Sequence, residues 1–222
     1  MICGIDEAGR GPLAGPVVAA AVVLPAEFPV EQLSDSKQIR EAERGELAEL
    51  IRARATRWGI SCAWHDEIDS LNIHHATLLA MRRAFAAMVG ISAAGTEMTR
   101  GVETDIDREA LTESGGMLEA ASVADSDAGA RVLVDGRFVP ELAWPAQAVV
   151  GGDRSIPAIQ AASILAKTSR DRWMISFAER RPGYGFERHK GYPTADHRRA
   201  IGLLGPSPIH RLSFRLTPSA SA

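Results

Sequence analysis

The first 24 residues constrain the fold more than any other part of the chain. Residues 2–6 form a short strand candidate, and a glycine-rich loop over residues 7–15 follows it. Residues 17–24 are a continuous apolar run between Pro16 and Pro25, which predicts a buried strand. Two strands joined by a tight glycine loop favour an antiparallel pair.

The remainder of the chain alternates predicted strands and helices. We expect strands at residues 58–64, 132–135 and 147–150, and helices at residues 40–54, 66 to about 88, 156–179 and 194–204. Residues 90–131 are instead rich in Ser, Thr, Gly and acidic residues, and we interpret them as a flexible insertion with a short helix near residues 108–111. This order predicts an α/β architecture with a mixed sheet.

Composition excludes several classes of protein. The chain has 222 residues, of which 45% are hydrophobic and 24% charged, a mixture typical of a globular protein. Its longest apolar run, residues 17–24, is far shorter than the roughly 20 residues that span a bilayer. Cys3 and Cys62 form no C-x-x-C pair, so neither a disulfide framework nor a thiolate zinc site is indicated. Asp6 and Glu7 argue against a signal peptide, and we expect a cytoplasmic protein.

Charge is distributed unevenly along the chain. From residue 167 to the end, eleven lysines and arginines stand against four acids, although the whole chain has a net charge of −3. Residues 96–127 carry nine acids and only two arginines. A basic C-terminal quarter indicates a polyanionic partner, because Lys and Arg neutralise phosphates. The alternative is a solvated helix face.

Four carboxylates stand where predicted strands end. Asp6 and Glu7 end the first strand, Asp135 ends the fourth, and Asp153 follows the fifth by three residues. Acids at strand ends can converge at one edge of a sheet, and oxygen ligands without a His or Cys set suit Mg²⁺ or Mn²⁺. The alternative is that each acid caps a strand or a turn.

Three loops also carry candidate binding residues. Gly9, Arg10 and Gly11 allow a backbone to approach a ligand, although the spacing matches neither a dinucleotide-binding loop nor a P-loop. Lys37 begins a helix, and Tyr192 lies among basic residues, where an aromatic ring can stack on a sugar or base. Taken separately, each has a purely structural alternative: the glycine loop as a tight turn, the segment with Lys37 as a helix cap, and the segment with Tyr192 as a turn. The six histidines show no spacing that builds a metal site or a triad, and no serine lies in a G-x-S-x-G elbow.

Six motifs follow one another along the chain and cover nearly all of it outside residues 90–130. They are Gly4-Ile5-Asp6-Glu7-Ala8-Gly9-Arg10-Gly11-Pro12-Leu13-Ala14-Gly15-Pro16-Val17, Leu33-Ser34-Asp35-Ser36-Lys37, Leu71-Asn72-Ile73-His74, Val134-Asp135-Gly136, Ala161-Ala162-Ser163-Ile164-Leu165-Ala166-Lys167, and Gly183-Tyr184-Gly185-Phe186 with His189-Lys190-Gly191-Tyr192-Pro193-Thr194. Taken in this order, they resemble the motifs of ribonuclease HII, the type 2 ribonuclease H.

The resemblance implies a fold and an activity. The fold is a ribonuclease H-like mixed sheet flanked by helices: a catalytic domain over residues 1–180 and a basic helical extension over residues 181–222 that contacts substrate. The activity is Mg²⁺- or Mn²⁺-dependent endonucleolytic cleavage of RNA in RNA–DNA hybrids and on the 5′ side of single ribonucleotides in duplex DNA. We expect a monomer, and no segment indicates a protein partner.

The resemblance also assigns roles to residues. The metal site falls on Asp6, Glu7, Asp135 and Asp153. The loop that senses the 2′-hydroxyl group falls on Gly9, Arg10 and Gly11, the tyrosine at the ribo–deoxyribo junction on Tyr192, and a phosphate-contacting lysine on Lys37.

Three features depart from the family pattern. Residues 151–155 read Gly-Gly-Asp-Arg-Ser where the family usually has Lys-Gly-Asp-Ser-Lys, so a positive charge is lost or moved to Arg154. Leu212 replaces an arginine in the usual His-Arg-Arg-Ser-Phe, and the acidic stretch over residues 96–127 is an insertion.

Two other classes of protein compete with the ribonuclease hypothesis: a nucleic-acid-binding module that has lost catalysis, and a nucleotide-phosphate enzyme that uses the glycine loop. The absence of a Walker lysine counts against the second.

Overall fold

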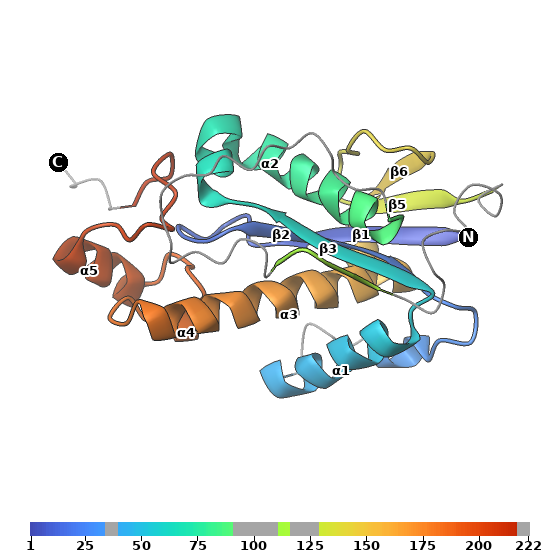
Figure 1. The fold of residues 1–222 in the computed structure, drawn as a ribbon, viewed down its shortest axis with the longest axis horizontal. Helices are drawn as coiled ribbons and strands as arrows, with labels where there is room; N and C mark the ends of the chain where they lie inside the picture. Colours follow the sequence, from blue (N-terminus) through green and yellow to red (C-terminus); the bar gives the residue numbers. More distant parts are fainter. Residues whose placement is uncertain (34–39, 91–110, 116–128, 217–222) are drawn as a thin grey trace.

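A six-stranded mixed sheet forms the centre of the molecule (Figure 1). The computed structural model describes residues 1–33, 40–90, 111–115 and 129–216. The order of strands across the sheet is β4-β3-β2-β1-β5-β6. Their bounds are β1 (Ile2–Ala8), β2 (Val17–Val23), β3 (Arg57–Ala63), β4 (Glu113–Gly115), β5 (Arg131–Asp135) and β6 (Ala146–Val149).

The two halves of the sheet differ in strand direction. β1 pairs antiparallel with β2, as the glycine loop between them predicts, and β3 and β4 continue the antiparallel half. On its other side β1 pairs parallel with β5, and β5 pairs parallel with β6. The predicted α/β architecture with a mixed sheet is confirmed.

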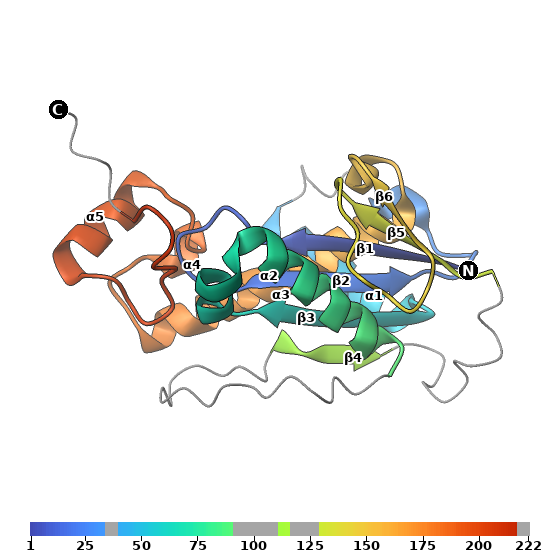
Figure 2. The same cartoon turned by 90° about the horizontal axis from the view of Figure 1, so that it is seen from above.

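Helices cover both faces of the sheet. α1 (Glu41–Arg54) and α3 (Pro157–Arg180) lie on one face, and α2 (His65–Met88) lies on the other (Figures 1 and 2). α4 (Phe186–His189) and α5 (Ala195–Leu204) form a helical C-terminal region at one end of the molecule, as expected. Two single turns complete the described structure, η1 (Val30–Leu33) and η4 (Gly152–Arg154). No helix among these residues is long and apolar enough to cross a membrane.

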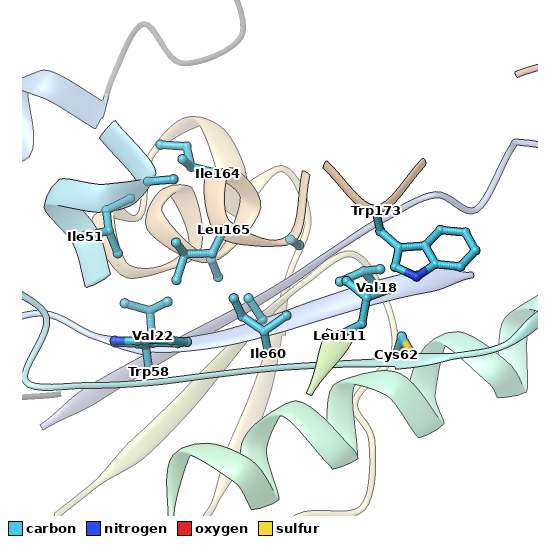
Figure 3. Close-up of a cluster of buried hydrophobic side chains, with 14 of the residues drawn as sticks. Val18, Val22, Ile51, Trp58, Ile60, Cys62, Leu111, Ile164, Leu165 and Trp173 are labelled. Carbon is cyan, nitrogen blue, oxygen red and sulfur yellow. The ribbon is translucent and has the colours of Figure 1, made fainter. Parts of the chain in front are cut away.

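Strand β2 is buried on both faces of the sheet, which explains its continuous apolar sequence. Val18 and Val22 pack on the α1 and α3 side, together with Ile60, Ile51 and Leu165 (Figure 3). The alternate residues of β2 pack on the α2 side: Val17, Ala19, Ala21 and Val23. A strand buried on both faces needs apolar side chains at every position, which is why residues 17–24 show no alternation.

One expectation from sequence needs correction. The segment over residues 90–131, interpreted as an insertion without strands, contributes β4, which pairs with β3 at the edge of the sheet. Most of that segment lies outside the described residues, including all but Leu111 of the predicted short helix. Cys3 and Cys62 are both buried and free; β2 separates their strands, and the two residues belong to cores on opposite faces of the sheet.

Candidate active site

The parallel strands bring the predicted acids to one edge of the sheet. Asp6 and Glu7 lie near the carboxyl end of β1, Asp135 is the last residue of β5, and Asp153 lies in η4 just beyond β6. In parallel strands the carboxyl ends meet at the same edge, so the topology itself gathers these side chains.

Asp6 is buried between the sheet and α3. It is 5% exposed, and its carboxylate accepts the Glu7 backbone N–H at 2.8 Å and a hydrogen bond from the Ser163 hydroxyl of α3. Gly4, two residues earlier on the same face of β1, allows this close packing, because a Cβ there would lie 2.2 Å from the Ala158 carbonyl carbon.

Like charges repel one another at this edge. Burial raises the pKa of Asp6 well above its usual range, and repulsion from Glu7 and from Asp135 adds to the effect. Burial also raises the pKa of Glu7, Asp135 contributes further, and the Arg10 guanidinium at 3.2 Å opposes the shift. The carboxylates therefore lack enough positive charge nearby, and a bound cation would relieve their repulsion.

Asp153 joins this group through its backbone. Its N–H donates to Asp135 Oδ1 at 3.4 Å. Gly151 begins the turn with a φ of 71°, a left-handed conformation that glycine adopts without strain, so the departure from the family's lysine at this position suits the local backbone. Within the described part of the chain, no three His, Cys, Asp or Glu side chains stand at metal-holding geometry. The fit to a cation therefore rests on the chemistry and repulsion of the oxygen donors.

A cavity of about 390 Å³ opens beside these acids. It brings together Glu7, the loop Gly9, Arg10 and Gly11, and the ring of Tyr192, which is 39% exposed. Asp6, Asp135 and Asp153 do not line it. Lys37, the remaining predicted binding residue, lies outside the described residues.

Three further polar residues line the cavity and were not singled out from sequence: Arg44 of α1, and Ser163 and Lys167 of α3. Lys167 Nζ lies 5.7 Å from the centroid of the Tyr192 ring and forms an ion pair with Asp171 at 2.8 Å. The i, i+4 spacing of Ser163 and Lys167 places both on one face of α3, a signal that was present in the sequence.

Comparison with known proteins gives the family. A model of the family described as ribonuclease HII matches residues 3–217. The chain belongs to the ribonuclease HII family. The ribonuclease HII of Hyphomonas neptunium is 49% identical over 215 residues, covering 96% of this chain and 93% of the relative. That of Dechloromonas aromatica is 47% identical over 214 residues, covering 96% and 90%.

Solved structures show the same fold. The ribonuclease H2 of Pyrococcus horikoshii superposes with a TM-score of 0.66 at 19% identity, covering 97% of this chain and 94% of that one. The ribonuclease HII of Archaeoglobus fulgidus, solved in complex with PCNA, gives 0.62 at 22% identity, covering 96% and 92%. The expected ribonuclease H-like fold is thus confirmed, and membership of the family makes this protein a ribonuclease H endonuclease.

Proposed function

We propose that this enzyme incises the 5′ side of single ribonucleotides embedded in duplex DNA, and also cleaves RNA in longer RNA–DNA hybrids. The products would carry 5′-phosphate and 3′-hydroxyl ends, because water rather than the neighbouring 2′-hydroxyl attacks the phosphorus. The observation that carries the proposal is the shared cavity, in which an acid, a glycine loop and an exposed tyrosine ring lie together.

Asp6, Glu7, Asp135 and Asp153 would hold two divalent cations, Mg²⁺ or Mn²⁺. A related ribonuclease HIII has been solved in complex with Mn²⁺. Bound cations of this kind supply activation of a water molecule and neutralisation of charge on the departing 3′ oxygen. The mutual repulsion of Asp6, Glu7 and Asp135 supports this assignment.

The other residues of the cavity would bind and orient the substrate. The backbone of Gly9 and Gly11 would contact the 2′-hydroxyl group that distinguishes RNA from DNA. The Tyr192 ring would stack against the sugar at the ribo–deoxyribo junction. Arg10, Lys37 and Lys167 would contact phosphates, and the basic region over residues 181–222 would bind the duplex backbone.

Three end-labelled duplexes test this function. One is all DNA, one contains a single ribonucleotide, and one is a full RNA–DNA hybrid; each is incubated with Mg²⁺, with Mn²⁺ and with a chelator. We expect metal-dependent incision on the 5′ side of the single ribonucleotide and an intact all-DNA duplex. Cleavage of the long hybrid alone would contradict the junction role of Tyr192.

The matched control is Asp135→Asn, which keeps the shape of the side chain and removes its charge. Loss of several kcal/mol of transition-state stabilisation predicts a fall in cleavage rate of at least about 10³-fold. Binding of the uncut duplex should persist. A wild-type protein that binds these duplexes and cuts none of them with either metal would instead be a binding module without catalysis.

A further inference from the structure

Two arginines lie buried beneath the glycine loop that lines the cavity. Arg170 comes from α3 and Arg211 from the segment after α5, and both side chains are 0% exposed. Neither can reach a bound duplex without unfolding, so their role must be sought in the contacts they make inside the protein.

Arg211 donates hydrogen bonds to four backbone carbonyls of the loop. Nη2 contacts the Gly9 oxygen at 2.6 Å, and Nη1 contacts the oxygens of Arg10 at 3.1 Å and Pro12 at 2.8 Å. Nε contacts the Gly15 oxygen at 2.9 Å. A single guanidinium thus holds both ends of the loop, although Arg211 lies about 200 residues after the loop in sequence.

Arg170 holds the next part of the loop and ties it to the segment before Tyr192. Its Nε donates to the Pro16 oxygen at 2.9 Å and its Nη2 to the Ala14 oxygen at 3.1 Å. Its Nη1 donates to the Lys190 oxygen at 3.0 Å. The loop and the tyrosine segment, the two sides of the cavity, therefore share one donor group.

Close contacts keep these groups in place. A Cβ on Gly9 would lie 2.2 Å from Arg170 Nε, and one on Gly191 would lie 2.6 Å from the Ala14 oxygen. The Leu13 N–H also donates to the Gly191 oxygen at 2.8 Å. The glycines thus leave room for the guanidinium and for the tyrosine segment, so each part fits only against the other.

The direction of the carbonyls fixes the direction of the amides. In a trans peptide the C=O and the following N–H point to opposite sides, and the described residues contain no cis peptide bond. Because the Gly9 and Arg10 carbonyls point to Arg211, the N–H groups of Arg10 and Gly11 point away from it. Arg211 thus sets the orientation of two donors on a loop that lines the cavity.

Only arginine suits this arrangement. Its planar group carries five N–H donors in a fixed fork, whereas lysine offers a compact point charge on a flexible stem. The arrangement is costly, since burial lowers the pKa of Arg170 to about 10 and that of Arg211 to about 9. A buried charged group that donates its hydrogen bonds to backbone carbonyls indicates that it serves to fix the conformation of the loop more than to stabilise the fold.

An anchor on α2 holds the Arg211 segment from outside. Asp69 accepts the backbone N–H groups of Leu212 at 2.8 Å and Ser213 at 2.9 Å, and the Ser213 hydroxyl at 2.5 Å. Asp69 can therefore be changed without removing any hydrogen bond that Arg211 donates to the loop, although its negative charge also acts to raise the pKa of Arg211.

We propose that Arg170 and Arg211 are positioning residues that set how the Gly9–Gly11 backbone and Tyr192 face one another, and so determine discrimination in favour of a single ribonucleotide. This inference rests on the proposed function of that loop. A long hybrid presents a 2′-hydroxyl group at every step and tolerates a displaced loop, whereas an isolated ribonucleotide offers one hydroxyl in one register.

The test compares Arg211→Lys and Arg170→Lys with wild type on two duplexes, one with a single ribonucleotide and one a full hybrid. The control is Arg131→Lys, the same change on an exposed residue at the opposite end of β5 from Asp135. We expect kcat on the single ribonucleotide to fall at least about 10-fold, because small displacements of positioning groups in an active site lower the rate steeply. The ratio of kcat/KM between the two duplexes should shift at least about 5-fold toward the hybrid.

A merely structural role gives a different pattern, in which both duplexes lose the same factor in proportion to the folded fraction measured by circular dichroism. An unchanged ratio in folded Arg→Lys variants overturns the proposal. If these variants do not fold, Asp69→Asn decides by the same ratio, since it loosens the segment from outside the core. A wild-type enzyme that leaves the single ribonucleotide uncut refutes the proposed function first, before any variant is compared.

Discussion

Two buried histidines make the stability of this enzyme depend on pH. His197 Nδ1 lies 2.9 Å from the Tyr192 carbonyl oxygen and so must donate, which leaves its Nε2 to accept from His210 Nε2 at 3.1 Å. His210 Nδ1 in turn accepts the Ser207 N–H at 2.7 Å. Every ring nitrogen of the pair has a partner that suits neutral imidazole. A second proton on His197 would set its Nε2–H against that of His210, and one on His210 would set its Nδ1–H against the Ser207 N–H and leave the Ser207 hydroxyl at 2.7 Å to accept it.

The magnitude follows from the pKa values. Burial, the largest cause, lowers the pKa of both His197 and His210 from 6.5 to about 4. A folded-state pKa below the unfolded value gives stability that is complete above pH 6.5 and is lost as the pH falls toward 4. Between about pH 7.5 and about pH 5, one such histidine removes about 2 kcal/mol from the free energy of unfolding. The pair is coupled, so we expect a loss of about 2 to 4 kcal/mol.

Urea unfolding at several pH values in this window measures the loss. The comparison protein is the double variant His197→Asn/His210→Gln, in which the amides retain hydrogen-bonding groups and cannot take up a proton. Asp6 and Glu7 act in the opposite sense, because their raised pKa values favour the folded state as the pH falls. Their contribution is present in both proteins and cancels in the difference.

The reasoning is refuted if wild type and the double variant lose the same free energy across the window. His75→Gln, at an exposed position of α2, controls for the change of residue type. The double variant is expected to be less stable at about pH 7.5, so the decisive quantity is the slope with pH and not the stability at one pH.

Other variants test the packing, the acids and the charge. Gly4→Ala should destabilise by at least about 2 kcal/mol in urea because its Cβ meets the α3 backbone, whereas Gly202→Ala, with open space around it in α5, should stabilise by about 0.5–1 kcal/mol. Without divalent metal, Asp6→Asn should raise the melting temperature in calorimetry, because it removes a carboxyl group whose charged form is disfavoured by burial and by Glu7, and it should weaken the stabilisation that added Mn²⁺ gives to wild type. Arg199→Gln changes an exposed residue. It should reduce by about 1 the steepness of the plot of log binding constant against log salt concentration for an uncut duplex. An unchanged slope would show that Arg199 does not contact the phosphate backbone of the bound duplex.

The helices and strands that could be predicted from sequence are those whose pattern of apolar residues indicates which of their faces are buried. The run over residues 17–24 predicted a buried strand because both faces of β2 are covered. Strand β4 gave no such signal. Its three residues, Glu113 to Gly115, contain no large apolar side chain, and they form a strand by pairing with the edge of β3. Gly115 lies against the Trp58 ring, where a Cβ would come within 3.1 Å, a contact that no local pattern reveals.

The candidate site was predictable where secondary structure positions it. Acids at the ends of parallel strands must meet at one edge, so Asp6 and Asp135 could be placed together from sequence. Arg44 could not, because a charged residue on a helix is typical of a solvated face. Only the packing of α1 against α3 brings Arg44 to the cavity beside Lys167, whose i, i+4 spacing from Ser163 was visible in the sequence.

The basic C-terminal quarter shows why charge in a sequence and charge on a surface differ. Two interpretations were open for its eleven lysines and arginines, a nucleic-acid interface and a solvated helix face. Arg170, Lys190 and Arg211 belong to neither, because all three are buried and donate to backbone carbonyls. The charges of Arg170 and Arg211 are directed at the inner side of the loop, whereas Lys190 Nζ donates to the Glu187 carbonyl oxygen and pairs with Glu41 at 3.5 Å. Buried in this way, none of the three is placed to contact a phosphate directly. The residues left to bind a duplex are therefore fewer than the count suggests, and part of the basic character of this region serves to shape the cavity itself.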